Sequence, residues 1–314
     1  MTMSDLIPYV HQVGGWHKGI QSRVLKDEDG HILKPVKLNA NPTYDTTGST
    51  SPITHLNNDS GKNADKEIAP VCRDELQLYN HVMTSTSQDD VLLKSLMPAY
   101  YGSRQIVFED GTVIPHLILE DLAAGFDLPC VADIKMGSNF YYPGQEKNKQ
   151  RIKYATQSEL GFCVTGLRVF HPASGRLITE LRPNTCKQLS ISETLEGLDK
   201  FCQKDTNFCS SLCCAFVTQL MCIHEWFLKQ RSYKIRCGSV LILYDAAKLE
   251  TPKISSNDSV TAAVNGEPGV CELTPKVRVK MIDFAHVLHS SGERDENYIF
   301  GLENLIKFFS NKEQ

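Results

Sequence analysis

Hydrophobic positions along the chain form short β-type runs in several places. HILKPVKL (31–38) and TVIPHLILE (112–120) each follow an Asp-Gly step, at Asp29-Gly30 and Asp110-Gly111. Asp-Gly between hydrophobic runs is typical of a hairpin turn, so we expect two hairpins. Runs rich in β-branched and aliphatic residues predict further strands at 160–170, 238–245 and 277–288.

A spacing of three and four residues between hydrophobic positions predicts helices elsewhere. Residues Cys72 to Met83 form one such segment, with Leu76, Tyr79 and Met83 on one face. Residues 301–309 (GLENLIKFF) predict a terminal helix. A longer stripe predicts a core helix through Phe208, Leu212, Phe216, Leu220, Ile223 and Phe227.

Two stretches, 39–70 and 248–276, lack this periodicity and are rich in polar residues, Gly and Pro. Such segments bury too little apolar surface to offset their ordering entropy, so we expect a disordered insertion at 39–70 and a flexible loop at 248–276.

Charge and cysteine content narrow the class of protein. The 314 residues include 33 Lys+Arg and 37 Asp+Glu, a net charge of −4, which argues against a general nucleic-acid binder. We expect no transmembrane segment, because no apolar run approaches the roughly 18 residues that a membrane helix needs. The 11 cysteines have irregular spacing, which indicates free thiols in a reducing compartment.

Two carboxylates stand out against apolar surroundings. Asp133 and Lys135 lie two residues apart and so on one face of an extended segment, where an exposed surface ion pair is the simpler interpretation. Asp283 interrupts an otherwise apolar run, and His286 follows at a turn. A carboxylate at a buried strand end is where phosphoryl-transfer enzymes hold Mg²⁺, and the second cluster favours that chemistry for both.

A basic run follows the first cluster. Lys147, Lys149, Arg151 and Lys153 lie close together in a chain of negative net charge. Such a run is usually a solvated helix face, but it also suits a ligand with several phosphates.

Other candidates have simple structural explanations. His224 and Cys222, with Cys213 and Cys214 upstream, lack paired Cys-x-x-Cys spacing, so core packing is favoured over a zinc site. Gly14-Gly15-x-x-x-Gly19 is not a dinucleotide fingerprint, and we expect it to cover the nucleotide phosphates. The His-Arg-Asp triplet of protein kinases is missing.

The sequence resembles the inositol polyphosphate kinases. The family signature Pro-x-x-x-Asp-x-Lys-x-Gly is complete as Pro129, Asp133, Lys135 and Gly137, preceded by LILEDLAAGFDL. Matches to the family continue at HQVGGWHKG, HILK, RDELQLYNHV, ELGFCVTGLRVF, GSVLILYD, IDFAH and YIFGLENLI. The resemblance covers most of the chain outside the two polar stretches.

The resemblance implies a nucleotide site. Lys34 matches the lysine that contacts the ATP phosphates, and Glu75 its ion-pair partner. Glu120 and Leu122 resemble the hinge that binds adenine through backbone groups, and Asp133 falls where the family binds the ribose hydroxyls.

The resemblance also implies the metal and substrate sides. Asp283 matches the Mg²⁺ ligand, and Ser239 matches a serine of the metal site, although only one hydroxyl of the family's Ser-Ser pair remains. Lys135 would point at the transferred phosphoryl group or the inositol phosphate, with His286 close enough to donate to a phosphate. Asp133, Lys135 and Asp283 would be the catalytic residues. The basic run would supply further substrate contacts from Lys149, Gln150 and Lys153.

The fold implied is a two-lobed, kinase-like α+β fold. Residues 1–122 would form an N-terminal lobe with a small antiparallel sheet, and residues 123–314 a larger mixed C-terminal lobe, with the inositol-phosphate-binding helical segment at 138–160. The implied enzyme is an ATP- and Mg²⁺-dependent kinase that acts on inositol tris- and tetrakisphosphates. Phosphoinositide headgroups are further substrates to consider, and a monomer in cytoplasm and nucleus is expected.

Three alternatives remain open at this point. The chain could belong to a branch of the family that acts on inositol hexakisphosphate, or to the 3-kinase branch that acts on inositol trisphosphate. The compact 23 residues from Ser138 to Leu160 leave little room for the longer insertion of the 3-kinase branch. A non-catalytic scaffold with the same fold is the third, and the retained Asp133, Lys135 and Asp283 argue against it.

Overall fold

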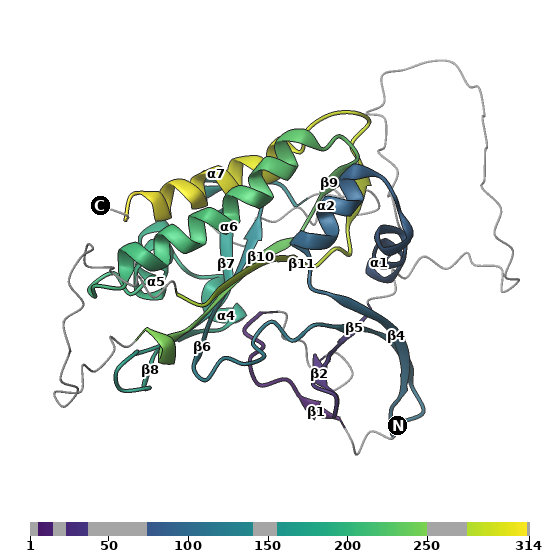
Figure 1. Ribbon diagram of the computed structural model, residues 1–314, viewed down its shortest axis with the longest axis horizontal. Helices are drawn as coiled ribbons and strands as arrows, with labels where there is room; N and C mark the ends of the chain where they lie inside the picture. Colours follow the sequence, from purple (N-terminus) through teal and green to yellow (C-terminus); the bar gives the residue numbers. More distant parts are fainter. Residues whose placement is uncertain (1–5, 15–22, 37–73, 141–155, 250–274, 313–314) are drawn as a thin grey trace, which may run out of the picture.

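Two antiparallel sheets form the framework of the protein (Figure 1). The computed structural model describes residues 6–14, 23–36, 74–140, 156–249 and 275–312. The first sheet has the order β1-β2-β3-β5-β4, with strands Ile7–Pro8, Leu25–Lys26, Ile32–Pro35, Val113–Leu119 and Tyr100–Val107. The second has the order β11-β10-β6-β7-β8, with strands Val277–Ile282, Ser239–Asp245, Pro129–Met136, Phe162–Phe170 and Leu177–Leu181. A small sheet pairs β12 (Val287–His289) with β9 (Tyr233–Ile235).

The helices divide between the two sheets. α1 (Glu75–Thr84) and α2 (Gln88–Leu96) follow β3, and α2 also contacts α6 and β11 of the second lobe. The long helices α5 (Ile191–Phe201), α6 (Cys209–Lys229) and α7 (Glu296–Ser310) cover the second sheet, with α6 and α7 side by side (Figure 1). The short helical pieces are α3 (Gln157–Leu160), α4 (Pro183–Cys186) and the 3₁₀ turn Ala246–Lys248. The result is the two-lobed α+β fold expected from the sequence.

Both expected hairpins are present. Gly30 lies in the turn between β2 and β3 at φ 85°, and Gly111 lies in the turn between β4 and β5 at φ 80°. A backbone with positive φ favours Gly at these positions, which is why the Asp-Gly steps predicted the turns.

Helix α1 is shorter than the segment expected from Cys72, and it buries a different face. Asp74 caps its start by accepting a hydrogen bond from the Gln77 amide at 3.0 Å. The fully buried side chains are Leu78, Tyr79 and Val82, whereas Leu76 and Met83 are half-buried. The expected stripe therefore marked the edge of the buried face.

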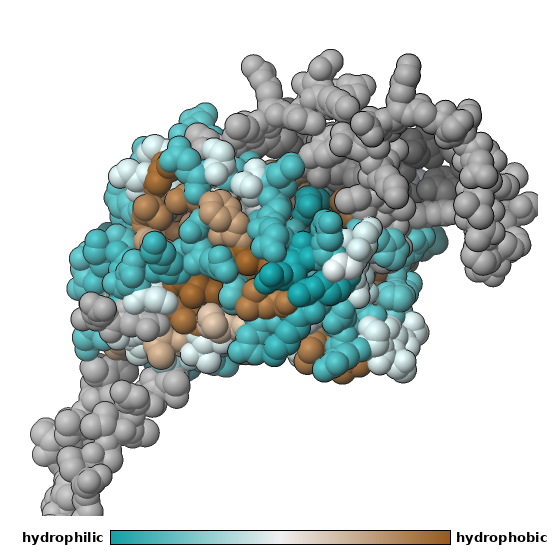
Figure 2. All heavy atoms as spheres, turned by 90° about the horizontal axis from the view of Figure 1, so that it is seen from above, coloured by the Kyte–Doolittle hydropathy of each residue, from teal (hydrophilic) through white to brown (hydrophobic). Residues whose placement is uncertain are grey.

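Helix α6 confirms the expected core helix. Leu212, Phe216, Leu220, Ile223 and Phe227 are all 0% exposed. By length and composition α6 could also cross a membrane. Its packing against α7 and β11 identifies it instead as a core helix. On the face of the molecule shown in Figure 2, hydrophilic residues interrupt the hydrophobic patches.

The strand-forming run at 277–288 makes two strands, and the strand end expected at Asp283 and the turn expected at His286 lie in the break between them. β11 ends at Ile282, Asp283 has φ 65°, and β12 begins at Val287. A left-handed residue cannot continue a strand, so the chain turns at Asp283 and pairs with a different partner, β9. The terminal helix is also longer than expected, because Asp295 caps α7 and accepts from the Tyr298 amide.

The remaining expectations concern thiols, loops and lobe boundaries. All nine cysteines in the described parts of the chain are free. The insertion at 39–70 lies outside the described residues, as does most of 248–276 and of 138–160. The lobe boundary at residue 122 stays a prediction.

Candidate active site

One lysine bridges two carboxylates that come from distant parts of the chain. Lys34 lies on β3, Glu75 is the first residue of α1, and Asp283 follows β11. The Lys34 Nζ lies 2.8 Å from Glu75 Oε1 and 2.5 Å from Asp283 Oδ1. The ion pair expected between Lys34 and Glu75 is therefore present, and it has Asp283 as a third member.

The charges of this cluster support one another. Burial disfavours the Lys34 ammonium, but the carboxylates of Asp283 and Glu75 outweigh that effect and raise the pKa of Lys34 above its usual value. Glu75 Oε1 also accepts a hydrogen bond from the Phe284 amide at 3.0 Å. Glu75 thus fixes both the lysine and the backbone beside Asp283.

Asp283 adopts a conformation that non-glycine residues rarely take. Its φ of 65° places it in the left-handed region, which Asp tolerates better than most residues. The turn brings its side chain, 36% exposed, out of the sheet and next to Lys34. Such backbone outliers concentrate at functional sites, and this one directs a carboxylate into the candidate site.

The signature residues lie beside this cluster on adjacent strands. β6 carries Asp133 and Lys135, and β10 places Ser239 opposite Lys135 on one side and opposite Ile282 on the other. Asp133 is 6% exposed and Ser239 is 1% exposed. Asp133 Oδ1 and Ser239 Oγ form no well-directed hydrogen bond among the described residues, although the Ser239 hydroxyl lies close enough to Asp133 to act against the rise in its pKa. Buried oxygens without partners are costly, which indicates groups that a ligand completes.

Asp133 is held in place by close backbone contact. A Cβ at Gly14 would lie 1.9 Å from Asp133 Oδ2, so only Gly fits there. Gly166 lies opposite Asp133 on the neighbouring strand β7, and it makes a similarly close approach to the backbone of Val13. Burial, followed by the negative charge of Asp283, raises the pKa of Asp133. Two carboxylates that disfavour each other's charge are typical of a site that receives a cation.

The residues present fit a Mg²⁺ site. Mg²⁺ binds oxygen ligands, mostly carboxylates together with water and substrate phosphates. Asp283 supplies an accessible carboxylate, and the hydroxyl of Ser239 lies one strand position from it and forms no well-directed hydrogen bond among the described residues. The orphaned oxygen of Asp133 adds a further acceptor at this end of the sheet.

Cations complete the site on the β6 side. Burial disfavours the ammonium of Lys135, but the charge of Asp283 outweighs it and raises the pKa of Lys135. His286 is half-buried, and its carbonyl accepts from the Arg236 amide at 2.9 Å. Lys149, Gln150 and Lys153 lie outside the described residues.

The expected hinge directly follows β5. Glu120 forms a backbone hydrogen bond to Ala99, and its carboxylate accepts from the Ala99 amide at 3.1 Å. The carbonyl of Leu122 accepts from Arg278 Nη1 at 2.5 Å. At such a hinge, the Glu120 carbonyl and the Leu122 amide are the backbone groups that would form hydrogen bonds to adenine.

Asp121, between the two hinge residues, is a structural centre that the sequence did not reveal. It is 5% exposed and accepts from Tyr9 Oη at 2.6 Å, Lys26 Nζ at 2.7 Å and the Ala123 amide at 2.9 Å. Burial would raise the pKa of Asp121, but the hydrogen bonds from Lys26 and Tyr9 outweigh it and lower the pKa. Nothing in the hinge sequence distinguished this acid from Glu120.

The glycine of the signature has a packing explanation. Gly137 has φ 99°, and a Cβ there would lie 2.2 Å from Asn297 Nδ2. Asn297, on α7, accepts from the Asn139 amide at 2.8 Å and donates to its carbonyl at 3.1 Å. Asn297 thus fixes the chain where it leaves β6. Asn297 lies one residue before the matched segment YIFGLENLI, so the sequence comparison did not single it out.

Comparisons with known proteins identify one family. The family model "Inositol polyphosphate kinase" matches residues 116–310. Inositol polyphosphate multikinase beta of Arabidopsis thaliana is 31% identical over 235 residues, covering 67% of this chain and 71% of that protein. Inositol polyphosphate multikinase IPK2 of Oryza sativa subsp. indica is 30% identical over 328 residues, covering 97% and 94%. Inositol hexakisphosphate kinase 3 of Mus musculus is 31% identical, covering 60% of this chain and 49% of that protein.

Solved structures of similar proteins share the fold. A structure of inositol phosphate multikinase has a TM-score of 0.56 at 24% identity and covers 76% of this chain and 98% of that one. The S. cerevisiae multikinase, crystallised with ADP and Mn²⁺, has a TM-score of 0.56 at 19% identity, covering 78% and 97%. The family model covers more than half of the chain and the relative from rice nearly all of it, and so this chain belongs to the inositol polyphosphate kinase family.

Proposed function

We propose that this protein is an ATP- and Mg²⁺-dependent inositol polyphosphate multikinase. It transfers the γ-phosphoryl group of ATP to hydroxyls of inositol tris- and tetrakisphosphates. The observation that carries the proposal is the Glu75–Lys34–Asp283 cluster beside the two oxygens of Asp133 and Ser239 that form no well-directed hydrogen bond among the described residues. The relatives named multikinases in Arabidopsis and rice support the same assignment.

The nucleotide half of the site contains the Glu75–Lys34–Asp283 cluster, and some contacts within this cluster are replaced by contacts to ATP when the nucleotide binds. Lys34 contacts ATP phosphates, and Glu75 keeps its ammonium in position, as the analogous pair does in protein kinases. Asp283 and Ser239 would hold Mg²⁺, which would supply positive charge against the phosphates of ATP. Asp133 accepts from the ribose hydroxyls, while the backbone of Glu120 and Leu122 holds adenine.

The substrate half supplies positive charge. Lys135 and His286 face the transferred phosphoryl group and the inositol phosphate, where their donors favour the charge that develops. Lys149, Gln150 and Lys153 contact the phosphates of the ring. In-line transfer needs no covalent intermediate on the protein.

A panel of inositol phosphates with three to six phosphate groups tests the proposal. With ATP and Mg²⁺, we expect phosphorylation of several members, with products resolved by position. Turnover of inositol hexakisphosphate alone, or of one trisphosphate alone, would assign the chain to another branch of the family. An active wild type beside an inactive Asp283→Asn variant would exclude the non-catalytic scaffold.

A double variant tests the substrate half separately. Lys149→Ala with Lys153→Ala should raise the KM for inositol phosphate and leave the KM for ATP nearly unchanged. The loss should shrink with added salt, because such contacts are partly screened. The control is Lys229→Ala, at an exposed cation on α6. A solvated helix face would show neither effect.

Three further properties belong to this proposal. The protein acts as a monomer, it works in cytoplasm and nucleus, and it accepts phosphoinositide headgroups as well as free inositol phosphates. The nine free thiols of the described residues suit a reducing compartment. Size-exclusion chromatography, cell fractionation and vesicles containing phosphoinositides test these points in turn. The lobe boundary at residue 122 can be tested by limited proteolysis.

A further inference from the structure

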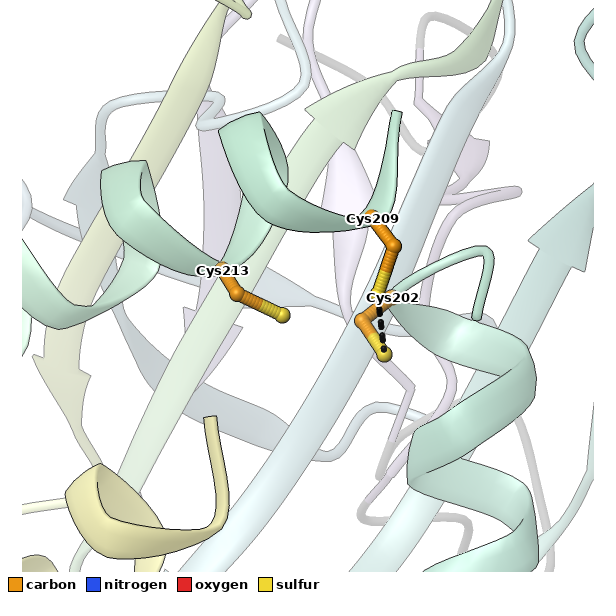
Figure 3. A group of neighbouring side chains, drawn as sticks. All are labelled: Cys202, Cys209 and Cys213. Atoms are coloured by element: carbon orange, nitrogen blue, oxygen red, sulfur yellow. Dashed lines mark hydrogen bonds between the residues drawn. The ribbon is translucent and has the colours of Figure 1, made fainter. Parts of the chain in front are cut away.

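Three cysteines lie close together where α5 ends and α6 begins (Figure 3). Cys202 follows the last residue of α5, Cys209 begins α6, and Cys213 lies one turn further along α6. Their three sulfurs all lie within 4.8 Å of one another, and the Cys202 and Cys209 sulfurs are 3.8 Å apart. None of the other six described cysteines belongs to such a group.

The local structure fixes this arrangement. Gln203 takes a positive φ of 56° directly after Cys202, which turns the chain back toward α6. Its side-chain amide donates to Tyr244 Oη at 2.8 Å and to the Phe170 carbonyl at 3.0 Å. The turn is therefore attached to the second sheet, and the thiols are held together before any ligand arrives.

The sulfur spacing matches the geometry of a thiolate metal site. A Zn²⁺–sulfur bond of about 2.3 Å in a tetrahedral site places two sulfurs about 3.8 Å apart. The Cys202–Cys209 separation already has this value. The third sulfur needs at most a small side-chain movement. Cys209 is 8% exposed and Cys202 and Cys213 are 0% exposed, so a fourth ligand would reach the ion from the Cys209 side.

The electrostatic surroundings favour thiolates once a cation is bound. A cation that binds here must displace the thiol protons, as in other thiolate sites. The Lys312 ammonium lies near Cys202 and Cys209, and it also forms an ion pair with Asp199 at 2.8 Å. Three thiolates and Zn²⁺ leave one net negative charge, which the Lys312 ammonium and the N-terminus of α6 partly offset.

We propose that Cys202, Cys209 and Cys213 bind one thiophilic d¹⁰ cation, for which Zn²⁺ is the fitting probe. The bound ion joins the end of α5 to the start of α6 and stabilises that corner of the second lobe. Two of the three thiols come from α6 and the third from the turn after α5, without a Cys-x-x-Cys pair, which is why the sequence pattern favoured packing alone.

The test is zinc binding to the full-length protein under reducing conditions, in competition with a chromophoric chelator. The wild type should retain one equivalent of Zn²⁺. Cys209→Ser should weaken binding by more than about 100-fold, since even loss of a group that only supports a metal ligand costs 10–100-fold. Cys214→Ser is the matched control, because Cys214 adjoins Cys213 on the same helix but is exposed. The Cys214→Ser variant should bind Zn²⁺ like the wild type. Zn²⁺ should raise the melting temperature of the wild type and of Cys214→Ser, and leave that of Cys209→Ser unchanged.

A measurement on the wild type alone guards against a variant that fails to fold. Zn²⁺ should slow alkylation of Cys209, which is 8% exposed whereas Cys202 and Cys213 are 0% exposed, and leave Cys214 reactive, as read by peptide mass spectrometry. Binding of less than one equivalent would overturn the proposal. So would equal affinity of the Cys209→Ser and Cys214→Ser variants, or unchanged labelling of Cys209.

Discussion

Asp121 and Asp133 are equally buried, at 5% and 6% exposed, yet their surroundings are opposite. Asp121 has partners from Tyr9, Lys26 and the Ala123 amide, and its pKa is lowered. Asp133 has an oxygen without a partner among the described residues, and its pKa is raised. The comparison teaches that burial does not identify a functional acid. Hydrogen bonding separates the two acids of this pair, because the protein itself satisfies Asp121 and leaves one oxygen of Asp133 to a ligand.

The largest effect is expected at Asp283, whose charge adds to that of Asp133. Asp283→Asn removes a full negative charge from the metal site, so kcat should fall by about 10³-fold, equivalent to about 4 kcal/mol. Steady-state kinetics at saturating Mg²⁺ measure this. Asp110→Asn, the same change in an exposed hairpin turn, is the control. Turnover near the wild-type value in Asp283→Asn would remove Asp283 from the metal site.

Asp133→Asn should separate activity from stability. We expect kcat/KM to fall by about 100-fold, since an oriented acceptor for the nucleotide is lost. The melting temperature should stay constant or rise, because the amide carries no charge to bury unpaired. A large loss of stability with retained activity would show that Asp133 is structural and would reverse the comparison.

Asp121→Asn should show the opposite pattern. Loss of charge weakens the hydrogen bonds from Lys26 and Tyr9, and the free energy of unfolding should fall by about 2 kcal/mol. Denaturant unfolding measures the change, again with Asp110→Asn as control. Stability equal to that of the wild type would mean that the Asp121 contacts contribute little.

The smallest effect is the pH dependence of that stability difference. The folded-state pKa of Asp121 lies below the unfolded value of about 3.9. Its contribution is therefore complete above about pH 4 and is lost as the pH falls through the folded-state pKa. Unfolding curves of the wild type and Asp121→Asn should approach each other only in that acidic range. A difference that disappears near neutral pH would contradict the lowered pKa.

The sequence predicted the parts of the fold that depend on local pattern. Strong β-type runs identified β5, β7 and β10, and the regular stripe through Leu220 identified α6. It placed Asp283 at a strand end, where β11 stops, but it could not show that this residue adopts a left-handed conformation. It also shifted the buried face of α1, where Leu78 and Val82 belong to the core and Leu76 and Met83 lie at its edge.

The sequence predicted which residues form the candidate site, but not how these residues contact one another. The family signature singled out Asp133 and Lys135, and the ion pair of Lys34 with Glu75 was expected. The pattern could not show that Asp283 joins that pair or that Gly14 lies against Asp133. Both contacts join residues more than a hundred positions apart, so only tertiary structure reveals them.

The central claim is that Asp283 holds a metal that links the nucleotide to this cluster. Calorimetric titration of ADP with and without Mg²⁺ tests it directly, in the wild type, Asp121→Asn and Asp283→Asn. We predict that Mg²⁺ strengthens ADP binding to the first two proteins and not to Asp283→Asn. An equal strengthening by Mg²⁺ in Asp283→Asn would contradict the account.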